Sequence, residues 1–102
     1  MKTNTFSLNE LKEKTTPIFN AYPVKKAVLF GSYAKNEATG NSDIDLYVDC
    51  DGKLRGLDFV GLLENLVAAL GKEVDLIDKS HIEPDSPLFQ EIENEGIVLY
   101  EK

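Results

Sequence analysis

Residues 42–50 constrain the fold of this chain more than any other segment, because their side chains alternate strictly between two classes. A period of two is typical of a strand that buries one face. The apolar class should face a core: Ile44, Leu46, Val48 and Cys50. The other class should point the opposite way: Asp43, Asp45, Tyr47 and Asp49. This second face is acidic near its start, which ordinary strands avoid.

Another strand is expected just before this one. Residues 27–30 are wholly apolar and too few for a helix, so they should form a strand that is covered on both faces. Gly31-Ser32 ends it, and residues 33–37 are predicted to form a short helix. Gly31 and Ser32 would then lie at a helix N-terminus, where unpaired N–H groups and the helix dipole favour an anion.

The N-terminal part predicts two short helices, over residues 8–14 and 17–22. Ser7 and Glu10 fit a capping box for the first helix. Pro17 suits the first turn of the second, with Thr16 as its cap. Farther along the chain, Asp51-Gly52 favours a turn and a brief hairpin through residues 53–55.

The second half of the chain continues the alternation of helices and strands. An apolar stripe with helical spacing over residues 59–70 predicts an amphipathic helix that ends at Gly71. Residues 73–77 predict a strand, and residues 97–100 a last short strand or an extended tail. Residues 87–96 predict a helix that turns three side chains inward: Leu88, Phe89 and Ile92. This order of elements predicts one layered domain over residues 1–102.

The acidic face offers a site for a metal ion. Asp43 and Asp45 would lie about 7 Å apart along the strand, so their carboxylates can approach one or two hard cations. Mg²⁺ prefers such oxygen ligands and keeps positions open for substrate phosphates. Asp75 is the expected third carboxylate if its strand lies beside this one, whereas Asp78 is out of phase with it. Asp49, roughly 13 Å from Asp45, is interpreted as a solvated charge.

These residues alone leave two interpretations open. In the first, the two motifs have no function, because Gly-Ser turns and Asp-X-Asp pairs are each common on ordinary protein surfaces. Their occurrence in this order, each at the end of a predicted strand, also suits the transfer of a nucleotidyl or phosphoryl group. Such a reaction needs a phosphate cradle beside a metal site.

Composition argues against several kinds of partner, cross-link and location. The net charge of −7 and a single arginine, Arg55, argue against a long nucleic acid as the principal partner. One cysteine and one histidine exclude an internal disulfide and leave little for a zinc site. No segment approaches the roughly 18 apolar residues of a membrane span, and no signal region is seen, so a cytoplasmic protein is expected.

Two segments together resemble the signature of the minimal nucleotidyltransferase family of the DNA polymerase beta superfamily. They read Leu29-Phe30-Gly31-Ser32-Tyr33-Ala34-Lys35 and Asn41-Ser42-Asp43-Ile44-Asp45-Leu46. Lys35 stands where the family pattern has arginine, which keeps the charge but loses the planar fork. Asn36 stands where the pattern has glycine, and asparagine tolerates a left-handed turn. The similarity extends to residues 74–76 and 95–100, and so to nearly the whole chain.

The resemblance implies an α+β fold of the polymerase beta-like type, in which helices flank a small mixed sheet of three to four strands. The nucleotide-binding residues would be Gly31, Ser32, Lys35 and Ser42. The Mg²⁺-binding and catalytic residues would be Asp43, Asp45 and Asp75. Asp75 would act as a metal ligand or as the general base.

The same resemblance implies a reaction and a partner. The reaction would move AMP from ATP to a hydroxyl acceptor and release pyrophosphate. Members of the family often accompany a HEPN-domain protein, and several are antitoxins that modify a tyrosine of that ribonuclease with AMP. An antibiotic or other small acceptor is one alternative. The other is a catalytically silent module that neutralises a protein partner by occlusion; the presence of all three carboxylates favours the enzyme.

Overall fold

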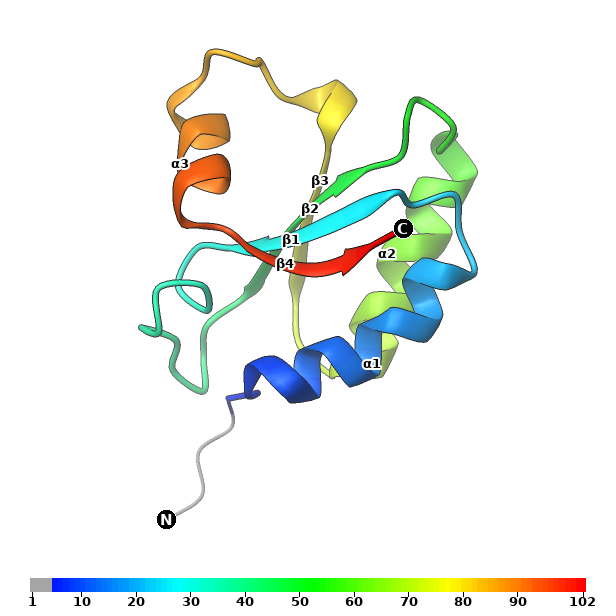
Figure 1. Ribbon diagram of the computed structural model, residues 1–102. Coiled ribbons are helices and arrows are strands. Elements are labelled where there is room, and N and C mark those ends of the chain that lie inside the picture. Colours follow the sequence, from blue (N-terminus) through cyan, green and yellow to red (C-terminus); the bar gives the residue numbers. More distant parts are fainter. Residues whose placement is uncertain (1–4) are drawn as a thin grey trace.

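A single mixed sheet organises the protein in the computed structural model, which describes residues 5–102 (Figure 1). Its strands are β1 (Lys26–Phe30), β2 (Ile44–Asp49), β3 (Val74–Asp78) and β4 (Ile97–Glu101). They lie in the order β3-β2-β1-β4. Strand β1 is antiparallel to both β2 and β4, whereas β2 and β3 are parallel. The mixed α+β sheet that the resemblance implied is therefore confirmed.

The helices cover the two faces of this sheet unequally. They are α1 (Leu8–Asn20), α2 (Gly56–Leu70), α3 (Pro87–Glu95) and a short 3-10 turn (Lys79–His81). Figure 1 shows α1 and α2 on one face and α3 alone on the other. Because parallel strands need a long crossover, α2 connects β2 to β3 across the first face.

Two apolar clusters follow from this arrangement. The larger lies under α1 and α2 and includes Leu11, Phe19, Leu62, Leu66 and the predicted core residues of β2. The smaller lies under α3 and consists of Val28, Phe30, Tyr47 and Ile92. The alternation predicted for β2 is confirmed, since Ile44, Leu46 and Val48 are fully buried. Tyr47 is buried as well, so only part of the opposite face is polar.

The N-terminal prediction of two helices is wrong, because α1 runs unbroken from Leu8 to Asn20 with Pro17 inside it. Proline removes one backbone hydrogen bond. The last turn is nevertheless held by packing, since Phe19 is fully buried and its ring lies 5.7 Å from that of Tyr100. Thr16 caps no second helix; its hydroxyl donates to the Lys12 carbonyl at 2.7 Å. The capping box of Ser7 and Glu10 is confirmed.

Residues 31–36 form consecutive turns and residue 37 is irregular, so the helix predicted over residues 33–37 does not form. The Lys35 N–H donates to the Gly31 carbonyl at 3.1 Å, and the Glu37 N–H donates to the Ser32 carbonyl at 2.8 Å. Asn36 lies between them at φ 60°, a left-handed conformation that ends any right-handed helix. Gly31 and Ser32 therefore lie in a turn and not at a helix N-terminus.

Three smaller expectations also need correction or confirmation. No hairpin forms over residues 53–55; a single hydrogen bond from the Lys53 N–H to the Cys50 carbonyl closes a turn there. Leu88 is 37% exposed and does not face the core, although Ile92 does. Gly71 ends α2 at φ 65°, as predicted. Within the described part of the chain, no helix is both long and apolar enough to cross a membrane.

Candidate active site

Two of the predicted carboxylates are direct neighbours across the sheet. In the parallel pairing of β2 and β3, Asp45 stands opposite Asp75. Partners in register on adjacent strands point to the same face, so both side chains lie on the face that carries α3. Asp43 immediately precedes β2, and both Asp43 and Asp75 are exposed. The expectation that Asp75 lies on the strand beside the acidic pair is confirmed.

The Gly-Ser turn meets this acidic pair. Phe30, the last residue of β1, is paired with Asp45, so the chain turns at Gly31 directly beside the carboxylate. Gly31 has φ +75°, and a Cβ at this position would overlap Asp45 Oδ2. Only glycine allows this conformation and this close approach together. The two motifs thus form one site at one end of the sheet.

Negative charge accumulates at the site without compensation. Burial, followed by the charges of Asp75, Asp43 and Glu91, raises the pKa of Asp45 from 3.8 to about 6. Among residues 5–102, none of the three predicted carboxylates has a lysine or arginine within ion-pair distance. The site therefore lacks a positive group at its centre.

The donor set fits a hard divalent cation. Carboxylate oxygens are the ligands that Mg²⁺ prefers, and excess negative charge beside a backbone turn is what a cation and a phosphate would balance. In the described residues, however, no three Asp, Glu, His or Cys side chains are already gathered into a metal cluster. The fit thus rests on oxygen chemistry and charge.

Lys35, predicted to bind the nucleotide, reaches across to α3. Its Nζ lies 3.7 Å from a Glu91 carboxylate oxygen and 3.8 Å from one of Glu95. Glu91 also acts on Asp45, so a fourth acidic side chain borders the site. Sequence reasoning missed Glu91. The helix was predicted, but nothing in its sequence says that this face turns towards the Gly-Ser turn.

The hydroxyl groups around the turn have different surroundings. Ser42 Oγ accepts the Thr39 N–H at 2.8 Å, so it shapes the loop that leads into β2. The Tyr33 hydroxyl is buried and has no hydrogen-bond partner in the described region. Tyr33 belongs to the motif, but its sequence gave no reason to expect a buried hydroxyl.

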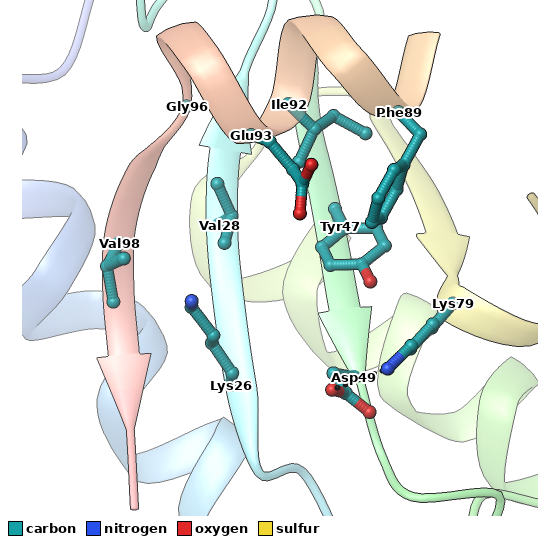
Figure 2. A pocket seen from close by; sticks show the side chains of 10 residues that line it. All are labelled: Lys26, Val28, Tyr47, Asp49, Lys79, Phe89, Ile92, Glu93, Gly96 and Val98. Carbon is teal, nitrogen blue, oxygen red and sulfur yellow. Dashed lines mark ion pairs between the residues drawn. The ribbon is translucent and has the colours of Figure 1, made fainter. Parts of the chain in front are cut away.

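Asp49 does not behave as the solvated charge that was predicted. Its carboxylate lies 3.5 Å from Lys79 Nζ, and only 17% of its side chain is exposed. Both residues line a cavity of about 340 Å³ beneath α3, which Figure 2 shows with Tyr47 and Glu93 pointing into it. None of the predicted site residues lines this cavity.

Asp78 is out of phase with Asp75, as predicted. Asp75 is exposed, whereas Asp78 is buried on the other face of β3. The Asp78 carboxylate accepts the Ser80 N–H at 3.0 Å and so begins the 3-10 turn after β3. Asp78 therefore serves the local structure and does not join the acidic cluster.

A comparison with protein families decides between the two interpretations of these motifs. The profile of the family described as Polymerase beta, Nucleotidyltransferase matches residues 13–102. This chain belongs to the polymerase beta nucleotidyltransferase family. The match includes the Gly-Ser turn, the acidic pair and Asp75, and it extends to the last residue of β4.

Individual relatives of this nucleotidyltransferase carry more specific names. A protein of Methanocaldococcus jannaschii named "Putative protein adenylyltransferase" is 44% identical over 78 residues, which cover 76% of this chain and 84% of that one. The protein adenylyltransferase MntA of Thermococcus cleftensis is 41% identical over 61 residues, 60% of this chain and 62% of that one. A crystal structure of a toxin-antitoxin with AMP-PNP contains a chain that matches with a TM-score of 0.76 at 27% identity. The match covers 89% of this nucleotidyltransferase and 73% of that chain.

Proposed function

We propose that this nucleotidyltransferase moves AMP from ATP to a hydroxyl group of a protein, most simply a tyrosine of a HEPN-domain toxin, and so acts as the antitoxin of a pair. The observation that carries the proposal is the meeting of Gly31 with Asp45 and of Asp45 with Asp75. The names of the relatives as protein adenylyltransferases support AMP as the group transferred. The likeness to a toxin-antitoxin chain supports a protein partner.

The turn would bind the nucleotide. Gly31 has no side chain between its backbone and the site, so phosphate oxygens can approach the N–H groups of Gly31 and Ser32. Lys35 would supply positive charge to the phosphates, and Ser42 would support the loop beside them. These interactions position the α-phosphate for attack and need no covalent intermediate.

The carboxylates would bind the metal ion, and one of them would accept the proton of the acceptor hydroxyl. Asp43, Asp45 and Asp75 offer the oxygen ligands for Mg²⁺, which when bound neutralises charge on the phosphates. Asp75 is exposed at the edge strand of the sheet, so an incoming hydroxyl can reach it. We propose that Asp75 accepts the proton of that hydroxyl, or serves as a ligand while the proton leaves to solvent.

The acceptor would be presented by the partner. Residues 1–102 are proposed to act as one domain, with the acidic site at an open end of its sheet. A protein can place a tyrosine over such a site and supply the contacts that orient it. A long nucleic acid suits the site poorly because the net charge of the chain is −7.

The test is transfer of label from ATP that is labelled at its α-phosphate. The protein is incubated with Mg²⁺ and a lysate of its own host, and a parallel reaction contains Asp43→Asn. A labelled protein band that disappears in the variant would establish adenylyl transfer and indicate the size of the acceptor. Transfer that persists in Asp43→Asn would refute the assignment of the acidic pair.

A second measurement, thermal melting with and without Mg²⁺ and ATP, separates the silent binding module from the enzyme. Such a module would bind its partner without transferring label, and Mg²⁺ with ATP would not raise its melting temperature. Binding of ATP without protein labelling would instead direct attention to a small-molecule acceptor. Each result thus selects one of the three functions.

A further inference from the structure

Helix α3 turns two glutamates towards the Gly-Ser turn. Glu91 and Glu95 are four residues apart, so they lie on the same face of the helix, one turn from each other. Lys35 Nζ lies 3.7 Å from Glu91 and 3.8 Å from Glu95, so one lysine is shared by two carboxylates. This arrangement joins the turn to a helix that lies far along the chain.

Glu91 also borders the acidic cluster. Its charge is one of the causes that raise the pKa of Asp45, after burial, Asp75 and Asp43. Its side chain is 32% exposed, less than that of Glu95 at 57%. Glu91 therefore pairs with Lys35 and is close enough to act on Asp45, whereas Glu95 pairs with Lys35 and is more exposed to solvent.

The ion pairs of Lys35 with Glu91 and Glu95 are weak enough for phosphate groups to replace them. No hydrogen bond within 3.5 Å joins Lys35 Nζ to either glutamate in the described residues, and all three side chains are partly exposed. Ion pairs of this kind change an equilibrium constant by at most about fivefold. A polyphosphate brings several charges to one place and would compete successfully for the same lysine.

We propose that Glu91 and Glu95 are positioning residues that hold Lys35 at the border of the acidic site until a nucleotide arrives, and then release it to the phosphate groups. This inference rests on the proposed function and specifies how the site admits a polyanion. The glutamates keep the lysine close to the site and partly neutralised. Because the glutamates compete with the phosphates for Lys35, they also lower the affinity for the nucleotide.

The test is calorimetric titration with α,β-methylene-ATP in the presence of Mg²⁺. The methylene group replaces the oxygen between the α- and β-phosphates, so AMP cannot be transferred and only binding is measured. We expect Glu91→Gln to bind about three- to fivefold more tightly than the wild type, because the lysine is freer and one repelling charge is gone. Glu93→Gln is the matched control, since Glu93 lies on the same helix but lines the separate cavity of Figure 2. Its affinity should equal that of the wild type.

A double-mutant cycle shows whether Glu91 acts through Lys35. Lys35→Gln should weaken binding, and in that background Glu91→Gln should lose most of its effect. An equal gain with and without Lys35 would overturn the inference, because Glu91 would then act by repulsion alone. Unchanged or weaker binding by Glu91→Gln would overturn it as well. Failure of the wild type to bind α,β-methylene-ATP would refute the proposed function itself, and with it the role of Glu91 and Glu95.

Discussion

Replacement of Asp45 by asparagine should stabilise the protein in the absence of ligand while it removes a proposed catalytic group. Asp45 is partly buried among Asp75, Asp43 and Glu91, which together with burial raise its pKa from 3.8 to about 6. At neutral pH its ionised form therefore opposes folding. Asparagine has nearly the same shape and carries no charge.

The size of the effect follows from the pKa. A rise from 3.8 to about 6 corresponds to about 3 kcal/mol of destabilisation when Asp45 is fully ionised. Solvent reaches part of the side chain and screens its charge, so we expect about half of this value, ~1.5 kcal/mol. For a domain of this size the melting temperature of Asp45→Asn should rise by roughly 6–12 °C.

The dependence on pH has a definite sign. The folded protein binds a proton at Asp45 more tightly than the unfolded chain does, so ionisation costs stability. The advantage of Asp45→Asn should be complete above the folded pKa of about 6 and should fade as the pH falls towards 3.8. Below that value both states of the wild type are protonated and the advantage should vanish.

Thermal unfolding followed by circular dichroism between pH 4 and pH 8 measures this difference. Asp85→Asn, a change of the same kind in an exposed turn before α3, is the control and should shift the midpoint very little. Equal melting temperatures of Asp45→Asn and the wild type at pH 8 would contradict the reasoning. So would a stabilisation that grows towards acid pH.

Substitutions at three further positions test the turn and the core. Gly31→Ala should destabilise the protein by about 1–2 kcal/mol from its positive φ alone. It should also abolish nucleotide binding, because the added Cβ overlaps Asp45; wild-type affinity for α,β-methylene-ATP would contradict this. Asn36→Ala should lower the free energy of unfolding in urea by about 1 kcal/mol, whereas Asn36→Gly should leave it nearly unchanged, since φ is 60° there. Equal losses for the two variants would argue against a left-handed turn. Leu66→Ala should lower the free energy of unfolding by about 2–5 kcal/mol, because Leu66 is fully buried on the inner face of α2; a loss below that range would mean that the cavity collapses.

Much of the fold was readable from local patterns. The strict alternation over residues 42–50 identified β2 and its buried face, because a strand exposes successive side chains to opposite sides. The apolar stripe over residues 59–70 identified α2, and Gly71 marked its end. These patterns succeed because each depends on the geometry of one element only.

The errors occur where tertiary contacts oppose local preference. Pro17 suggested a break, but burial of Phe19 against the sheet keeps α1 continuous. Residues 33–37 suggested a helix, but the chain must turn at Asn36 to reach β2. Asp49 was predicted to be solvated, but the fold places Lys79 beside its carboxylate.

Local patterns were enough to predict the chemical groups of the candidate site: a glycine turn, two carboxylates spaced to share one face, and a third carboxylate on a later strand. Whether these groups meet depends on how the strands pair. Parallel pairing sets Asp45 opposite Asp75, and the end of β1 brings Gly31 against Asp45. The tertiary structure also places Glu91 beside Lys35, which no sequence pattern predicted. Contacts between distant segments depend on how the elements pack, and a local pattern carries no information about the face that another element will present.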